Sequence, residues 1–202
     1  RMGRNMDKFI EYTNIKYSVD HFQEIYEKLK ATSFSTFTEC DVHSWLVCSN
    51  PDYKNIMEPI LSKHRQVHDN ICPLATGFNH SPAAVAPYHI PAHIDLDKPL
   101  FFNLLLPIEG SARITIYKTV INDLEYRHNK SHFMVPKNDN AELEVVDSIV
   151  VDKPVLLNTS VLHRVDILEA PRNVWCTRWI DVSGTYTVDT FKQHMETTLN
   201  AA

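Results

Sequence analysis

The chain has 202 residues, 44% of them hydrophobic, and a formal net charge of −5. This length and apolar content are enough for one sizeable core, so we expect a single domain spanning residues 1–202. The acidic balance argues against a duplex-DNA-binding surface, which needs an excess of basic side chains to neutralise phosphates. Nucleic acid is therefore not expected as a partner.

The four cysteines are scattered and form no Cys-x-x-Cys pair, so neither a zinc knuckle nor a thioredoxin-like motif is indicated. No apolar run approaches the ~20 residues of a membrane helix. Residues 1–6 lack the apolar stretch of a secretory signal. We therefore expect a cytoplasmic protein with reduced, mostly buried thiols and no membrane association.

The first third of the chain favours helices. Residues 20–31 repeat apolar side chains at helical spacing, namely Phe22, Ile25, Tyr26 and Leu29. Residues 44–48 suit a short strand, and residues 52–71 suit a second helix. We expect residues 7–71 to form a mainly helical N-terminal support for the rest of the chain.

From residue 72 onward, short apolar runs alternate with prolines. Strands are expected over residues 100–106, 113–117, 143–151, 155–158, 161–167 and 174–182. The polar stretch 122–140 predicts a surface hairpin or loop near the substrate entrance, and residues 188–199 predict a closing helix. Helices followed by many closely spaced strands indicate an α+β protein, mainly β, with a sandwich or small barrel over residues 72–182.

One spacing pattern, His-x-Asp/Glu, occurs twice, as His93-x-Asp95 and His194-x-Glu196. His194 and Glu196 lie on the expected terminal helix, where positions i and i+2 point to different faces. His93 and Asp95 lie in an extended segment just before a buried strand, so their side chains project from the same face. The first pair can therefore converge on one metal ion.

His163 is the candidate third ligand, because it begins an expected strand after a polar turn. Two imidazoles and one carboxylate form the facial triad of non-haem Fe(II) sites, which leaves positions open for a co-substrate and O₂. His64 and His68 also stand four apart on an expected helix. Arg65 follows His64 where a His-Glu-x-x-His metalloprotease has glutamate, so that motif is absent.

These residues resemble the Fe(II)/2-oxoglutarate-dependent oxygenases over roughly residues 88–181. The motifs that carry the resemblance are His93-x-Asp95, the strands within 100–117, and Leu157-Asn158-Thr159…His163-Arg164-Val165…Pro171-Arg172. The last run is most similar to the aspartyl/asparaginyl β-hydroxylase and cis-proline hydroxylase branch. The resemblance implies a jelly-roll (double-stranded β-helix) core in which His93, Asp95 and His163 bind Fe(II).

The resemblance also implies that 2-oxoglutarate chelates the iron and that Arg172 binds its distal carboxylate, for which a planar guanidinium is well suited. Many members carry Ser or Thr two residues after this arginine, whereas this chain has Val174. Another hydroxyl or amide is then needed, and the candidates are Tyr88, Asn103, Thr115 and Tyr117. Asn103 is preferred, because an amide inside an apolar strand needs a hydrogen-bond partner.

Two further arginines have rival interpretations. Arg178 is the alternative to Arg172, but six extended residues at ~3.3 Å each predict that it lies far from the iron. Arg113 could also reach the co-substrate, although an exposed strand arginine is the simpler interpretation.

The function implied by the resemblance is that of a dioxygenase. It would hydroxylate a C–H bond of an amino-acid or protein side chain and release succinate and CO₂, with a small molecule, a peptide or a protein as substrate. One alternative is a cupin-like metal-binding jelly roll without oxygenase activity. Another is a zinc hydrolase, for which the sequence offers no clear general base. Arg172 favours the oxygenase, since a simple binding module needs no cation at that spacing.

Overall fold

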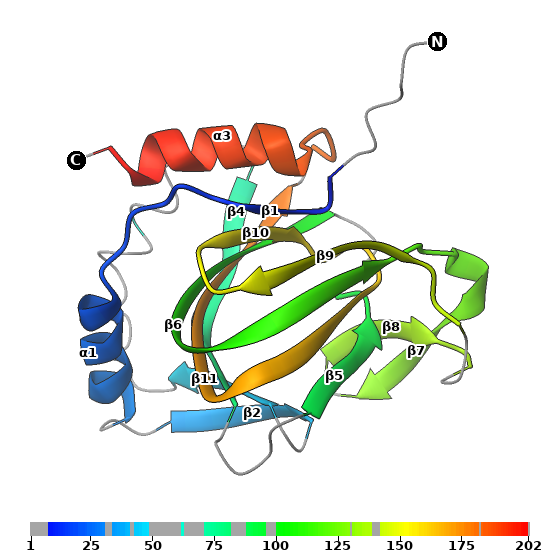
Figure 1. Ribbon diagram of the computed structural model, residues 1–202, viewed down its shortest axis with the longest axis horizontal. Coiled ribbons are helices and arrows are strands. Elements are labelled where there is room, and N and C mark those ends of the chain that lie inside the picture. The colour runs from blue at the N-terminus through cyan, green and yellow to red at the C-terminus, as the bar shows by residue number, and fades with distance from the viewer. Residues whose placement is uncertain are drawn as a thin grey trace.

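The computed structural model (Figure 1) describes residues 8–30, 34–40, 43–48, 62, 71–81, 88–95, 100–129, 131–138, 142–181 and 183–201. Within these ranges the chain is mainly β-sheet, accompanied by the helices α1 (Val19–Lys30) and α3 (Val188–Leu199). None of the helices that the structure describes is long and apolar enough to cross a membrane.

The strands fall into one large sheet and one hairpin. The sheet contains β1 (Ile10–Tyr12), β2 (Phe34–Cys40), β3 (His43–Cys48), β4 (Ile71–Ser81), β5 (Tyr88–His93), β6 (Leu100–Tyr117), β9 (Val145–Val151), β10 (Val155–Asn158) and β11 (His163–Asp181). The hairpin consists of β7 (Leu124–Asn129) and β8 (Ser131–Pro136), and it follows the short 3₁₀ helix η2 (Ile121–Asp123).

Two long strands, β6 and β11, pair with each other along nearly their whole length and fold back together (Figure 1). Their first and second parts therefore belong to different layers. The first layer has the order β1-β10-β6-β11-β4-β3-β2 and uses residues 100–108 and 174–181 of the long strands. The second layer has the order β9-β6-β11-β5 and uses residues 111–117 and 163–167. All these pairings are antiparallel, and the two layers form a jelly roll.

The space between the layers is filled by apolar side chains from both. Leu105, Val155, Leu157, Val174 and Cys176 of the first layer pack with Ile114, Ile116 and Val151 of the second. Side chains alternate along a strand, so the residues between these point outward. The inner face of β11 in the first layer consequently carries the even-numbered residues from 172 to 178, because its pairing with β4 is regular over that stretch.

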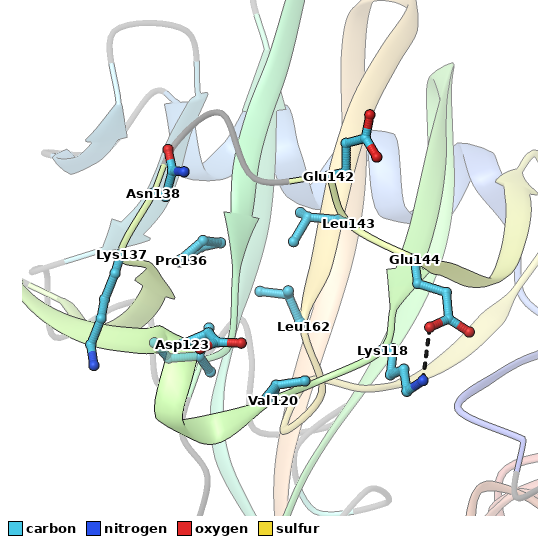
Figure 2. Close-up of a pocket in the computed structure, with 11 residues that line it drawn as sticks. Lys118, Val120, Asp123, Pro136, Lys137, Asn138, Glu142, Leu143, Glu144 and Leu162 are labelled. Atoms are coloured by element: carbon cyan, nitrogen blue, oxygen red, sulfur yellow. Dashed lines mark hydrogen bonds and ion pairs between the residues drawn. The ribbon is translucent and has the colours of Figure 1, made fainter.

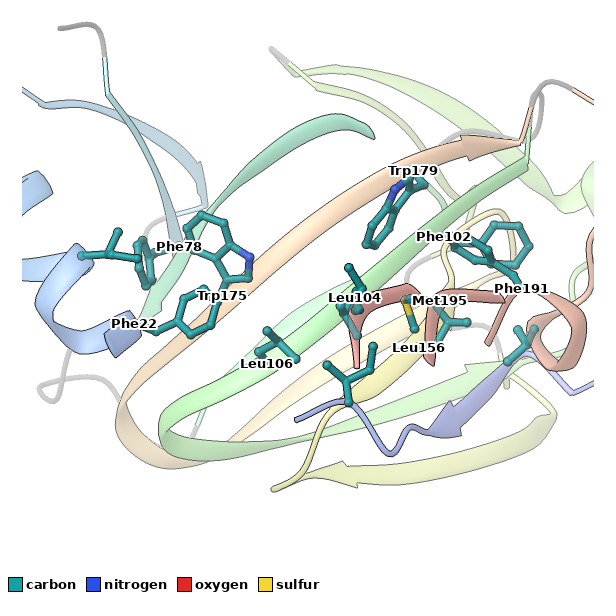
Figure 3. Close-up of a cluster of buried hydrophobic side chains, with 14 of the residues drawn as sticks. Phe22, Phe78, Phe102, Leu104, Leu106, Leu156, Trp175, Trp179, Phe191 and Met195 are labelled. Carbon is teal, nitrogen blue, oxygen red and sulfur yellow. The ribbon is translucent and has the colours of Figure 1, made fainter. Parts of the chain in front are cut away.

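Aromatic side chains cover the opposite face of the first layer (Figure 3). Trp175 and Trp179 of β11 are fully buried there, against Phe22 of α1 and Phe191 of α3 respectively. The two helices thus pack on the outer face of the first layer and leave its inner face to the second layer. This burial is the hydrophobic contribution that fixes both helices.

Several expected elements are confirmed. The expected helices 20–31 and 188–199 are α1 and α3, the expected strand 155–158 is β10, and the polar stretch 122–140 contains the hairpin β7–β8. The expected helix 52–71 lies outside the described residues, apart from Ser62, which is helical, and Ile71, which begins β4.

One expectation was wrong. The expected strand pairs 100–106/113–117 and 161–167/174–182 are two continuous bent strands, because β6 and β11 keep pairing across their common bend. In the region 7–71, the described residues contain strands as well as α1, including the expected strand 44–48, which is β3. This region contributes β1, β2 and β3 to the first layer, because the strands add to the two open edges of that layer at β10 and β4.

Candidate metal centre

The side chains of the His93-x-Asp95 pair and of His163, 68 residues after Asp95, meet at one end of the second layer. His93 ends β5, Asp95 follows it, and His163 begins β11 directly opposite His93 in the register of the two strands. One potential ligand atom from each of the three residues lies within 4.8 Å of the others. The two imidazole rings have their centroids 4.4 Å apart. The sheet register therefore brings together the three residues that the sequence singles out.

Hydrogen bonds set the orientation of both imidazoles. His93 Nδ1 lies 2.7 Å from the carbonyl oxygen of Pro91, and His163 Nδ1 lies 2.9 Å from that of Val161. A carbonyl oxygen only accepts, so Nδ1 must carry the proton and donate in each ring. The Nε2 lone pairs are left for a metal ion, which is the arrangement found in most histidine metal ligands.

The two oxygens of the Asp95 carboxylate face different charged or titratable groups. Oδ1 lies 3.6 Å from His93 Nε2, while Oδ2 lies 2.8 Å from Arg178 Nη2. The Asp95 side chain is only 6% exposed, and its backbone N–H donates to the carbonyl oxygen of Thr159 at 3.0 Å. One oxygen therefore faces the histidines and the other faces a cation.

The backbone between the two motif residues is anchored as well. Ile94 is almost fully buried and exchanges two backbone hydrogen bonds with Met134 of β8, at 2.9 and 3.2 Å. Because a strand alternates its side chains, burying Ile94 on one side turns His93 and Asp95 to the other. The hairpin β7–β8 therefore helps to position the motif.

The surroundings favour the protonation states that bind metal. Burial lowers the pKa of His163 to about 4, with a further contribution from the nearby His93. Burial alone would raise the pKa of Asp95, but Arg178, the two histidines and a side-chain hydrogen bond from Thr159 outweigh it and hold that pKa below its usual value. At neutral pH the site thus offers a neutral His163 imidazole and an ionised carboxylate, which fit a divalent cation of the facial-triad type.

Arg172 stands at the other end of the inner face, where β11 leaves the bend. Its side chain is buried, with 2% of the residue exposed. It shares strand parity with Val174 and Cys176, whose side chains fill the space between the layers. The parity of the strand therefore places Arg172 on the inner face of the first layer.

The other residues expected to bind the co-substrate are placed differently. Asn103 is buried, and its Oδ1 accepts a hydrogen bond from Arg178 Nε at 3.3 Å. Tyr88 pairs through its backbone with Ile167, but its side chain lies outside the described residues. Thr115 and Tyr117 alternate with Ile114 and Ile116 on β6 and so lie on the other face of the second layer, where both are buried and Tyr117 packs in the cluster that contains Ile94.

Arg178 corrects one expectation from the sequence. Six residues of extended chain were expected to place it far from the metal ligands, yet it contacts one of them at 2.8 Å. The reason is the bend of β11, which turns the strand back through the first layer toward the end where it started. A distance estimated from the number of residues in an extended chain does not account for such a turn. Arg113, in contrast, is exposed on the outside of β6, as expected for an ordinary strand arginine with no role in binding the co-substrate.

A separate cavity of about 360 Å³ lies beside the hairpin β7–β8 (Figure 2). Leu143 and Leu162 point into it, and Lys118 and Glu144 form a 2.8 Å ion pair at its edge. Its lining includes Leu162, the neighbour of His163, but none of the three clustered side chains. The cavity is therefore distinct from the candidate metal centre.

No family model matches the sequence, and no curated protein matches it. Solved structures do match. The non-haem alpha-ketoglutarate-dependent epimerase SnoN from nogalamycin biosynthesis has a TM-score of 0.56 at 9% identity, over 87% of this chain and 78% of SnoN. AviO1 from Streptomyces viridochromogenes has a TM-score of 0.55 at 12% identity, over 90% and 93% of the two chains.

A second structure of SnoN, in complex with Fe3+, alpha-ketoglutarate and nogalamycin RO, has a TM-score of 0.54 at 7% identity, over 87% of this chain and 79% of SnoN. At such identities the similarity concerns the fold. SnoN holds iron and 2-oxoglutarate in that fold, and this chain has a His-Asp-His cluster in it that could bind a metal ion. This chain therefore shares the overall fold of SnoN and AviO1.

Proposed function

We propose that the protein is a non-haem Fe(II)- and 2-oxoglutarate-dependent oxygenase. It would hydroxylate a C–H bond of an amino-acid or protein side chain and release succinate and CO₂. The observation that carries the proposal is the cluster of His93, Asp95 and His163, with both Nε2 atoms and one carboxylate oxygen available to a single ion. A cupin-like metal-binding protein without oxygenase activity is the alternative, and the experiment below separates the two.

The bound iron and 2-oxoglutarate would supply the oxidation chemistry, as cofactors do in such enzymes. The protein would contribute the positions of the ligands. His93, Asp95 and His163 would occupy one face of the ion and leave the opposite face open. Their low exposure, 12% for the His93 side chain and 6% for that of Asp95, limits access of water to the ion.

Arg172 would bind the distal carboxylate of 2-oxoglutarate. Its inward position at the bend, on the same face of β11 as Arg178 but at the opposite end, supports this role. A cation as close to Asp95 as Arg178 could meet only the end of the co-substrate nearest the metal. Asn103 and Tyr88 remain our candidates for the additional hydrogen bond to the co-substrate. The substrate itself would be a small molecule, a peptide or a protein.

The proposal is tested by anaerobic visible spectroscopy while Fe(II) and then 2-oxoglutarate are added. We expect a metal-to-ligand charge-transfer band in the wild-type protein and none in His93→Ala. His194→Ala is the matched control, because His194 belongs to the other His-x-acidic pair, on α3, and should keep the band.

Admitting O₂ to the loaded protein should then convert 2-oxoglutarate to succinate, and a hydroxylated substrate should gain the mass of one oxygen atom. A protein that binds Fe(II) but gives neither the band nor succinate would contradict the oxygenase and favour the cupin-like alternative.

A further inference from the structure

Arg178 links two buried polar groups that the sequence treats separately. Its Nη2 lies 2.8 Å from Asp95 Oδ2, and its Nε donates to Asn103 Oδ1 at 3.3 Å. Asn103 is the direct register partner of Arg178 on the neighbouring strand β6. One planar guanidinium therefore joins the loop after β5 to two strands of the first layer.

The Asp95 carboxylate of this ion pair is buried, and the Arg178 side chain is 24% exposed. Removing a carboxylate from water costs free energy that the attraction to its partner often fails to recover, so the pair is weak evidence for a role in stability alone. The carboxylate in this pair, however, belongs to the His-Asp-His cluster, and Arg178 takes the oxygen that does not face His93. The arrangement controls which oxygen of Asp95 is available to a metal ion.

That choice matters for the number of open positions. An octahedral ion that is bound by one atom from each of three side chains has three open coordination positions. These are enough for 2-oxoglutarate, which binds through two atoms, and for O₂. A carboxylate bound through both oxygens would occupy one of them. An enzyme that needs all three positions must therefore hold its carboxylate to one oxygen.

We propose that Arg178 is a positioning residue that keeps Asp95 a single-oxygen ligand, and that Asn103 holds Arg178 in place. The inference rests on the proposed metal site but adds a role that the ligands themselves do not define. It also gives a use to Asn103, the one amide in the apolar stretch of β6 from 100 to 108. In this role Asn103 acts through Arg178, beside any direct contact with the co-substrate.

The test uses Mn(II) as the probe, bound to the full chain without co-substrate. The number of metal-bound waters is read from the broadening of the Mn(II) electron paramagnetic resonance signal in ¹⁷O-labelled water, and affinity is read from a titration. In Arg178→Gln we expect one bound water fewer than in the wild type. We also expect roughly 10- to 100-fold weaker Mn(II) binding, as is typical when a group that orients a metal ligand is removed.

The matched control is Arg164→Gln. Arg164 is the neighbour of His163, and its Nη2 pairs with Asp166 Oδ1 at the same 2.8 Å, but neither residue belongs to the cluster. This variant should keep the wild-type water count. Asn103→Ala provides a second test that leaves the guanidinium in place, and it should shift the water count in the same direction as Arg178→Gln.

The number of metal-bound waters tests the proposed role of Arg178. A wild-type count in Arg178→Gln would overturn the proposal, and if that variant does not fold, a wild-type count in Asn103→Ala would do so. Failure of the wild-type protein to bind Mn(II) or Fe(II) would instead contradict the proposed function, so the two failures are distinguishable.

Discussion

The two arginines on the inner face of β11 have the same chemistry and different surroundings. Arg178 contacts Asp95 and Asn103, close to the cluster, whereas Arg172 is buried where the strand leaves the bend. Six residues separate them, which corresponds to ~20 Å of extended strand. The two guanidinium groups therefore belong to different ends of the interior, and we propose that Arg172 is the one that binds the distal carboxylate of 2-oxoglutarate.

Replacing Arg172 should weaken binding of 2-oxoglutarate and spare the metal. We expect Arg172→Gln to raise the dissociation constant of 2-oxoglutarate by about 10- to 100-fold, since a charge-assisted hydrogen bond is worth about 1.5–3 kcal/mol. Arg172→Lys should weaken binding of 2-oxoglutarate less, because lysine keeps the positive charge but not the bidentate geometry of arginine. Calorimetric titration of the Mn(II)-loaded protein measures the effect. Arg113→Gln, on the exposed side of β6, is the control, and an unchanged affinity in Arg172→Gln would rule out this role.

At the scale of the element, the common bend of β6 and β11 decides how the site is assembled. Gly110 adopts a φ of +67° there, and a side chain at this position would collide with the carbonyl oxygens of Glu169 and Pro171. Hydrogen bonds join the two strands on either side of it, from Asn173 Nδ2 to Glu109 Oε2 at 2.8 Å and from Ser111 Oγ to Glu169 Oε2 at 3.0 Å. The two strands therefore turn as a unit.

Gly110→Ala should destabilise the protein more than Gly184→Ala does. Gly184 has nearly the same φ, +65°, but nothing lies within 4 Å of the position that its Cβ would take. Both variants bear the left-handed strain of about 1–2 kcal/mol, and only Gly110→Ala adds a backbone collision of about 1–3 kcal/mol. Urea denaturation measures both free energies of unfolding, and equal losses would show that the close packing at the bend is unimportant.

The connection from β11 to α3 depends on one buried carboxylate. Asp181 Oδ1 accepts hydrogen bonds from the Ser183 hydroxyl at 2.6 Å and from the Gly184 N–H at 3.0 Å, and Oδ2 accepts one from the Tyr186 N–H at 2.9 Å. Burial would raise the pKa of Asp181, but these hydrogen bonds outweigh burial and lower it. The ionised form is therefore the one that stabilises the folded chain.

The contribution of Asp181 should depend on pH. Because its pKa is lower in the folded protein, its stabilisation is present above the ordinary pKa of 3.8 and is lost as the pH falls through the folded value. We expect Asp181→Asn to reduce the free energy of unfolding by about 1–3 kcal/mol at pH 7. The difference from the wild type should shrink at pH 3 in urea denaturation. A difference that stays constant between the two pH values would contradict the prediction.

At the scale of the whole molecule, β6 and β11 make the two layers inseparable. Each strand supplies residues to both layers, and the apolar cluster between them draws side chains from both. Opening one layer would expose the inner face of the other and break pairing within the same strands. The helices α1 and α3 are tied to the outer face of the first layer through Trp175 and Trp179.

The protein should consequently unfold in one cooperative transition. Tryptophan fluorescence and far-ultraviolet circular dichroism should give the same urea midpoint, since both follow loss of the shared strands. Adding Mn(II) at 100 times its dissociation constant should stabilise the wild type by about 2.7 kcal/mol, and it should not stabilise His93→Ala. Two separated transitions would contradict a single domain over residues 1–202.

The sequence by itself determined the local elements and the identity of the clustered residues. Periodicity is a local property, so α1, α3 and β10 follow from it. His93 and Asp95 are two residues apart in extended chain, which places both on one face before any tertiary contact exists. The jelly roll and His163 were predicted through the resemblance and the strand pattern.

The tertiary structure alone decided what depends on the path of the chain through space. It joined the predicted strands into β6 and β11, added β2 and β3 to the sheet, and placed Thr115 and Tyr117 on the face of the second layer opposite Ile114 and Ile116. Above all, it brought Arg178 to Asp95, 83 residues earlier in the sequence, through a bend held by contacts between Gly110 and the backbone of β11. Contacts of that kind arise from packing between distant segments, and no local periodicity encodes them.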